Sequence, residues 1–374
     1  MVLVTAFVLY GIHLLVEVAS DLNYTGNSYE KVIHLVLKER WVINFAAAMI
    51  VALQFVVCIG GILFSVKLLN YSMCLGKVDA LCDNTRLITL IAFLISIPTY
   101  FVKDFKYFSN LTMMSTAMVI ILVGCITWKA GRALAIRGPA VQAPIDWTKL
   151  PNTFSLGAYA LEGIGMIIPV KSSMQEQSKF WNLTLVAVIG VAIFYSVPAV
   201  VLSQAFGVAT KQVVLNNLIE YSPLIHALSL VYIGCIFMTY TINLFPVYTI
   251  MLNTKWSRDY IGSKDLTANP ERPDRIKKVT VIARLICMVV IFCVSISAPN
   301  LVPFLSIGGA VFVATFGYFF PVFLYNTHFG RLGTLTRTKK FANYFFLLVM
   351  GGISVFTVVD GVKNLFAGQS SSLH

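Results

Sequence analysis

The most regular feature of this sequence is a series of long apolar runs separated by shorter polar connections. An α-helix rises about 1.5 Å per residue, so about 20 apolar residues are needed to cross a hydrocarbon layer about 30 Å thick. The runs are unbroken and lack the alternation of a membrane β-strand. We predict ten transmembrane helices, over residues 1–20, 44–75, 85–102, 109–128, 153–170, 182–206, 223–253, 280–298, 300–326 and 341–366.

The composition supports a membrane-embedded chain. Hydrophobic residues make up 58% of the 374 residues and charged residues 12%, and the mean hydropathy is +0.81. Soluble domains carry about 25% charged residues. In lipid, helices satisfy their own backbone hydrogen bonds. The expected fold is therefore all-α and polytopic, as a single membrane domain over residues 1–374 with the lipid bilayer as its surroundings.

The basic residues are distributed unevenly between the two sides. Of the 28 Lys and Arg residues, 18 lie in one alternate set of connections and eight in the other; Lys67 and Arg284 lie inside the runs. Cytosolic connections carry the excess of Lys and Arg. We therefore predict a long cytosolic loop at 254–279, a long outer loop at 129–152 and both ends of the sequence outside. Arg284 is expected to snorkel to the cytosolic interface.

The same distribution argues against nucleic acid as a partner, although the net charge is +12. The basic residues sit in connections, where they orient helices. Cys74 and Cys82 flank one predicted outer connection and could form a disulfide. No Cys or His spacing indicates a metal site, and we expect no cofactor.

One apolar run contains an unusual polar centre. The segment Leu161–Pro169 reads LEGIGMIIP and places Glu162 between apolar residues, followed by Gly163 and Gly165. A carboxylate near the middle of a membrane helix costs several kcal/mol, roughly 2.5–3.5 for the related Asp. Each glycine lowers helix propensity by about 1 kcal/mol relative to Ala. The pattern predicts a broken helix at 159–165 whose freed backbone groups bind a zwitterion, as in secondary transporters.

A structural interpretation of the same residues competes with this one. Small residues let membrane helices pack closely, so Gly163 and Gly165 could serve packing alone. Glu162 could then make a single structural hydrogen bond. The local pattern does not decide between the two interpretations.

Three segments resemble the amino acid/auxin permease family, especially its proton-coupled amino acid transporter branch. The segment LGAYALEGIGMIIPVKSSMQEQSKF is similar to the sixth helix of that family, FMTYTINLFPVYTIML to the eighth and LVPFLSIGGAVFVATFGYFFPVFLY to the tenth. The resemblance implies eleven helices in a five-plus-five inverted repeat with one extra helix. Our ten segments match helices two to eleven, so we expect that the family's first helix, which supplies half of the substrate site, is missing from this sequence.

The resemblance also implies the function and its location. It implies a secondary active transporter of small amino acids that works by alternating access, with H⁺ as the expected co-transported ion and Na⁺ as an open alternative. The plasma membrane or a lysosomal or vacuolar membrane is the implied location. A non-transporting amino-acid sensor on the same fold and an inactive fragment are the alternatives that we keep.

The candidate substrate-binding residues lie on three segments. They are Tyr159, Ala160, Leu161, Glu162, Gly163, Gly165, Thr239, Tyr240 and Ser306. Thr239 could instead bond back to its own helix, and Ser306 could serve packing. Glu162 and His13 are the candidates for proton coupling, because the charge of His changes near neutral pH. His13 could equally be a structural, hydrogen-bonded residue.

An enzyme is the main competing class, and the sequence argues against it. Intramembrane proteases need paired aspartates, a Ser with a His, or a His-Glu-x-x-His zinc site. Asp104 and Asp360 lie at membrane edges, and no Ser in a span has an identifiable His partner. We therefore predict that the chain is not an enzyme.

Overall fold

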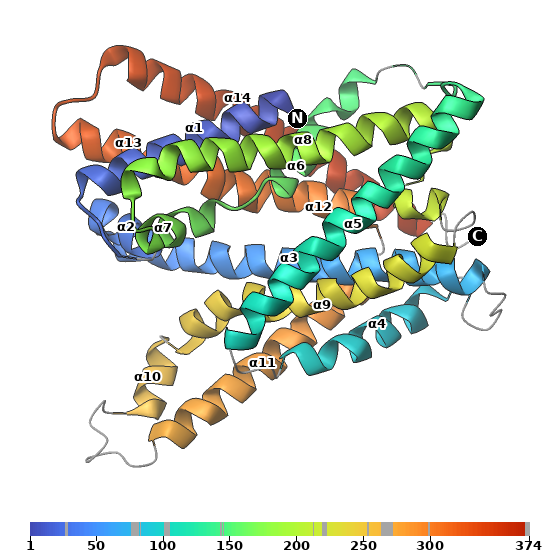
Figure 1. Ribbon diagram of the computed structural model, residues 1–374. Coiled ribbons are helices and arrows are strands. Elements are labelled where there is room, and N and C mark those ends of the chain that lie inside the picture. Colours follow the sequence, from blue (N-terminus) through green and yellow to red (C-terminus); the bar gives the residue numbers. More distant parts are fainter. Residues whose placement is uncertain are drawn as a thin grey trace. The chain divides into compact units, whose positions relative to one another are not determined.

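The fold of this chain is a set of helices joined by turns (Figure 1). The computed structural model describes residues 1–26, 29–75, 82, 84–100, 105–142, 144, 146–211, 213–218, 223–252, 254–262, 272–297 and 300–370. These described residues contain no strand. The predicted all-α fold is confirmed.

Nine stretches of the described chain are long and apolar enough to cross a membrane. They are Val2–Asp21 (α1), Arg40–Leu75 (α3), Met113–Arg137 (in α5, Phe105–Arg137), Trp147–Ser173 (α6 and α7), Gln177–Ala209 (around α8, Phe180–Phe206), Pro223–Tyr240 (in α9, Pro223–Leu252), Pro273–Ser297 (in α11, Arg272–Ser297), Leu301–Arg331 (α12, Leu301–Gly308, to α13, Phe320–Arg331) and Arg337–Asn364 (in α14, Arg337–Ser370). Each matches one predicted segment, so the protein is a multi-pass membrane protein.

The remaining predicted segment, 85–102, forms a shorter apolar helix. This helix, α4, covers Thr85–Tyr100 and has 16 residues. At 1.5 Å per residue it is about 24 Å long, less than the hydrocarbon thickness of about 30 Å. Residues 101 and 102 of the predicted segment lie outside the described part, so the predicted end at 102 stays a prediction.

The two long connections are more helical than predicted. Helix α5 continues to Arg137 and a short 3-10 turn begins at Trp147, so much of the expected outer loop at 129–152 is helical. The expected cytosolic loop at 254–279 contains α10, Lys255–Ile261, and the first turns of α11. Residues 263–271 lie outside the described part. Helices can extend past the bilayer because charged residues such as Lys and Arg are good helix formers in water.

An additional helix, α2, lies in a connection that we predicted only as polar. It covers Tyr29–Leu37 and buries Tyr29, Val32, Ile33, Val36 and Leu37. These positions follow the i, i+3, i+4, i+7 spacing of an amphipathic helix, so the signal was present in the sequence. Helix α2 packs on α13, and burial raises the pKa of the Glu30 carboxyl above its ordinary value.

The chain divides into two compact units. The first consists of Met1–Met49, Pro144–Ala199 and Val302–His374, and the second of Ile50–Ala143 and Val200–Leu301. In the first unit α1 packs on α13, and α6 packs on α14 and on the chain after α12. In the second unit α9 packs on α4, α5 and α11. The prediction that both form one transporter domain stays a prediction.

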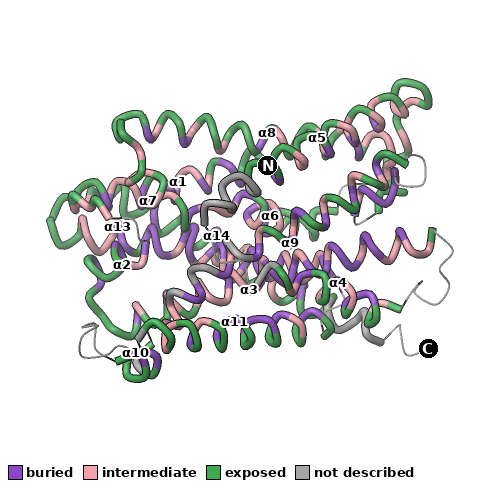
Figure 2. Tube along the Cα trace, turned by 60° about the horizontal axis from the view of Figure 1, so that its bottom comes forward, coloured by how far each residue is buried: buried purple, intermediate pink, exposed green. Residues whose placement is uncertain are grey.

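Burial differs strongly among the helices. The most apolar window of Leu301–Arg331 is 67% buried, whereas that of Gln177–Ala209 is 11% buried. Along α8, exposed Leu183, Val186, Ile189 and Ile193 give the mostly green tube of Figure 2. An apolar surface of this kind suits contact with lipid tails, so α8 is a lipid-facing helix and α12 to α13 form the interior of the first unit.

Arg284 differs from its expected snorkelling position. In the second unit, its side chain is 9% exposed, and its guanidinium lies over the Tyr248 ring at 5.5 Å from the centroid. A desolvated cation–π contact contributes about 2 kcal/mol, whereas removing an ion from water costs several kcal/mol. The ring therefore compensates only part of the burial of this charge.

Cys74 and Cys82 form the disulfide that the sequence suggested. Their Cα atoms lie 4.7 Å apart. The bond belongs to the predicted outer side, and disulfides form in oxidising compartments outside the cytosol. The pairing therefore agrees with the predicted orientation of this connection.

Candidate functional site

The predicted break in the helix is present. Helix α6, Leu150–Ala160, ends before Leu161, and helix α7 covers Ile164–Ser173. Leu161, Glu162 and Gly163 lie between the two helices, inside the predicted range 159–165. The first N–H groups of a helix have no partner within it, so the start of α7 leaves backbone donors beside the Glu162 carboxylate.

The glycines at the break make no close packing contact with the described residues. A Cβ atom built at Gly163 or at Gly165 would have none of their atoms within 4 Å. The described residues therefore give no support to the packing interpretation at these two positions. Their low helix propensity remains as the reason why the helix stops here.

A small hollow opens at the break within the first unit. Its lining consists of Val8, Leu161, Glu162, Gly163, Ile164, Val313, Gly317 and Tyr318. Its volume of about 10 Å³ has room for about one water molecule. The Glu162 side chain is half-buried and has no hydrogen-bond partner among the described residues. An unpaired carboxylate at a helix break is therefore free to bind a cationic group.

Tyr318 is a lining residue that the sequence analysis missed. Its side chain is 0% exposed, and its hydroxyl group has no hydrogen-bond partner among the residues that the structure describes. It lies in the segment that resembles the tenth helix, from which we had selected only Ser306. A buried hydroxyl group without a partner costs free energy, so Tyr318 is a second polar group available to a ligand.

Two π-helical segments form the wall of the hollow opposite the break. They cover Gly309–Val313 and Thr315–Phe319, where the sequence predicted one regular helix. A Cβ atom at Gly309 would overlap the Ser155 carbonyl oxygen of α6, and one at Gly11 of α1 would overlap the Gly317 carbonyl oxygen. Glycine at these positions therefore lets α6 and α1 approach the π-helical wall. Such π segments occur frequently at functional sites.

The other predicted substrate residues have mixed outcomes. Leu161, Glu162 and Gly163 line the hollow, whereas Tyr159, Ala160, Gly165 and Ser306 are not among its lining residues. Thr239 and Tyr240 belong to the second unit. The Thr239 hydroxyl donates back to the Ile236 carbonyl at 2.7 Å, and the Tyr240 hydroxyl donates to the Cys58 carbonyl at 2.8 Å. These are structural bonds, and a role in binding stays a prediction for both residues.

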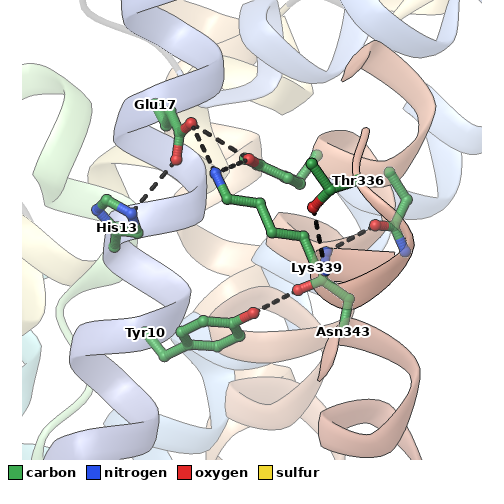
Figure 3. Close-up of polar contacts among 8 residues, drawn as sticks. Tyr10, His13, Glu17, Thr336, Lys339 and Asn343 are labelled. Carbon is green, nitrogen blue, oxygen red and sulfur yellow. Dashed lines mark hydrogen bonds and ion pairs between the residues drawn. The ribbon is translucent and has the colours of Figure 1, made fainter. Parts of the chain in front are cut away.

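His13 lies in a polar cluster and not among the lining residues of the hollow. Its Nε2 atom is 3.3 Å from the Glu17 carboxylate one turn along α1, and its ring contacts Trp181. The Glu17 carboxylate also accepts bonds from the Tyr325 hydroxyl at 3.2 Å and from Lys339 Nζ at 3.4 Å, as Figure 3 shows in part. The structure therefore joins His13 to Glu17 and Lys339.

A second chain of bonds extends this cluster along α14 (Figure 3). The Tyr10 hydroxyl donates to Asn343 Oδ1 at 2.5 Å, and Asn343 Nδ2 donates to Asn326 Oδ1 at 2.6 Å. Asn343 is 0% exposed. Together the contacts tie α1 to α13 and α14. Among the described residues, no group of His, Cys, Asp and Glu is arranged to hold a metal ion.

Comparison with known proteins shows the family to which this chain belongs. The family model described as transmembrane amino acid transporter protein matches residues 1–362. This chain belongs to that family. Membership in this transmembrane amino acid transporter family confirms the resemblance to amino acid permeases, and it agrees with the prediction that the chain is not an enzyme.

Relatives in the family are similar over parts of their length. The chain is 27% identical to vacuolar amino acid transporter 4 of Saccharomyces cerevisiae over 48% of this chain and 26% of that protein. It is 26% identical to amino acid transporter AVT3B of Arabidopsis thaliana over 44% of this chain and 35% of that protein. It is 22% identical to proton-coupled amino acid transporter-like protein pathetic of Drosophila melanogaster over 68% and 51%, respectively. The matches thus span between about a quarter and half of these relatives.

Proposed function

We propose that this chain is a secondary active transporter of small amino acids, coupled to protons and working by alternating access around the break between α6 and α7. The observation that carries the proposal is the unpaired, half-buried Glu162 carboxylate at the break. An amino acid is a zwitterion, and the break offers both kinds of partner that it needs. The N–H groups at the start of α7 suit its carboxylate, and freed carbonyls with the Glu162 carboxylate suit its ammonium.

The small size of the hollow supports a binding site whose walls move during transport. A volume of about 10 Å³ accepts about one water molecule, so an amino acid can enter only when the walls separate. The freed backbone at the break allows α6 and α7 to move as separate halves. Rocking of helices around a fixed midplane site is how alternating access works in such folds.

The coupled ion and the membrane location are inferred from the chemistry of a carboxylate at the break and from the names of two relatives. A carboxylate at a break can bind and release a proton during each cycle, and one relative is named as proton-coupled. Another relative is named as vacuolar, which favours a vacuolar or lysosomal membrane over the plasma membrane. Uptake driven by a pH gradient without Na⁺ supports proton coupling, whereas uptake that requires a Na⁺ gradient would contradict it.

The decisive experiment compares Glu162→Gln with wild type. We expect the variant to reach the membrane normally and to lose most uptake of labelled small amino acids, with a flattened pH dependence. Glu176→Gln is the matched control, because Glu176 is exposed and pairs with Lys179 at 2.6 Å on the surface. Unchanged transport kinetics and pH dependence in Glu162→Gln would remove the proposed role. Binding of amino acids without flux would instead identify a sensor.

A further inference from the structure

Arg284 is a buried cation in the second unit with no counter-ion in the part of the chain that the structure describes. Its side chain is 9% exposed and its Nε atom has no hydrogen-bond partner. No carboxylate among the described residues forms an ion pair with it. Charged side chains inside membrane segments are paired or mark ligand sites, so the missing partner needs an explanation.

The neighbour of Arg284 offers a second donor. The guanidinium of Arg284 on α11 lies 5.5 Å from the centroid of the Tyr248 ring on α9. The Tyr248 side chain is 6% exposed, and its hydroxyl group also has no partner. The face of an aromatic ring attracts a cation, but it does not replace acceptors for the five N–H groups of a guanidinium. On these adjacent helices, the Arg284 Nε–H and the Tyr248 hydroxyl group are thus both buried and lack an acceptor among the described residues.

The position of Arg284 separates it from the basic residues at the helix start. Lys277 and Lys278 are exposed, whereas Arg284 lies six residues beyond Lys278, about 9 Å along the axis. A lipid phosphate at the interface would meet the exposed lysines first. One guanidinium carries a single positive charge and therefore matches a small monoanion in charge.

We propose that Arg284 and Tyr248 form a binding site for a small monoanion, either an inorganic halide or the carboxylate of a small amino acid. The guanidinium supplies the charge and a planar set of donors, which suits a carboxylate or a halide. The Tyr248 hydroxyl supplies one further donor. The proposal rests on the second unit alone, so it holds whether or not the break at Glu162 binds substrate.

Thermal unfolding of the purified full chain in lipid nanodiscs tests the site. Chloride replaces the bulky anion gluconate at constant ionic strength. In a second series glycine is added in gluconate, with ethanolamine as the analogue that lacks the carboxylate. A ligand that binds only the folded state raises the unfolding midpoint in a saturable way. We expect a shift of about 2–4 °C near saturation with at least one of the two anions.

Two variants and one matched control make the test specific. Arg284→Gln is expected to abolish the chloride shift and to leave only the part of the glycine shift that binding at the Glu162 break contributes. Tyr248→Phe is expected to require about tenfold more anion at this site, because one hydrogen bond to a charged group is lost. Arg86→Gln removes an exposed Arg of the same unit and should keep the wild-type response. If Arg284→Gln does not fold, the weaker response of Tyr248→Phe decides the question.

The outcomes also separate the two sources of the anion. A shift with chloride alone identifies an inorganic anion. A glycine shift that ethanolamine does not reproduce and that Arg284→Gln reduces identifies the amino-acid carboxylate. The proposal is wrong if neither anion shifts the midpoint, or if Arg284→Gln or Tyr248→Phe responds as wild type does. Uptake by Glu162→Gln does not enter this test, so failure of one proposal leaves the other intact.

Discussion

At the scale of single residues, Gly309 controls the approach of α6 to the π-helical wall. A Cβ atom there would overlap the Ser155 carbonyl oxygen, and backbone atoms cannot move aside as the end of a flexible side chain can. We expect Gly309→Ala to destabilise the protein by about 1–3 kcal/mol, measured by thermal unfolding. Gly190→Ala on α8 is the control, because a Cβ atom there has no neighbour within 4 Å. Equal stability of the two variants would disprove the close approach.

At Tyr318, the effect of one hydroxyl group on stability can be measured separately from its effect on substrate binding. Its hydroxyl group makes no hydrogen bond in the structure, so Tyr318→Phe should leave the free energy of unfolding unchanged or raise it slightly. If the hydroxyl group contacts the substrate, the same variant should raise the KM for uptake about five- to tenfold. A loss of stability together with an unchanged KM would show that the group has a structural partner only.

At the scale of elements, the contacts between α1 and α14 are expected to contribute different amounts to the free energy of unfolding. Asn343 is fully buried between Tyr10 and Asn326. We expect Asn343→Ala to cost about 1–3 kcal/mol, because buried partners are left unsatisfied. Lys339→Met should cost less than about 1 kcal/mol, because its ion pair with Glu17 is exposed to water. Chemical denaturation of both variants checks this order. A larger loss of stability in Lys339→Met would show that the ion pair, and not Asn343, stabilises the contact between the helices.

The attachment of α2 should depend on pH through Glu30. Burial raises the pKa of this carboxyl in the folded protein, so the folded state binds the proton more tightly than the unfolded state. The stability that protonated Glu30 contributes is fully present below the pKa of this carboxyl in the unfolded protein. It is lost as the pH rises through the pKa of the same carboxyl in the folded protein. We therefore expect Glu30→Gln to be more stable than wild type at pH 7 and similar to it near pH 4, as measured by thermal unfolding. A constant difference across this range would contradict the burial of the carboxyl.

The elements were predictable to the extent that their signals are local. Apolar runs identify spans because about 20 residues must face lipid, and Glu162 with its glycines identified the break because each acts on its own helix. The bond from Tyr10 to Asn343 joins residues 333 positions apart, and no local pattern encodes it. The π-helical wall was also missed, because a change from i+4 to i+5 bonding leaves the apolar composition unaltered.

At the scale of the whole molecule, the disulfide reports the orientation of the chain. Cys74 and Cys82 lie on the predicted outer side. In intact cells or vesicles of known orientation, a charged thiol reagent should label these cysteines only after reduction and only from the outer or luminal side. The test uses a background in which the exposed Cys293 and the partly exposed Cys125 are replaced by Ser, so that the remaining free cysteines, Cys58, Cys235 and Cys287, are buried. Labelling should then disappear when Cys74 and Cys82 are also replaced by Ser. Labelling from the cytosolic side would reverse the predicted topology.

The two π-helical segments also affect how this chain can be aligned with related sequences. Each turn with i+5 bonding accommodates one residue more than a regular α-helix between the same flanking turns. A relative that lacks one residue between Gly309 and Phe319 can therefore keep α12 and α13 in the same rotational phase by forming a regular turn. A one-residue deletion inside α13 would instead turn every later side chain of that helix by about 100°. Gaps in this span thus belong in the π-helical wall, and a helical wheel drawn through 301–331 assigns wrong faces beyond Gly309.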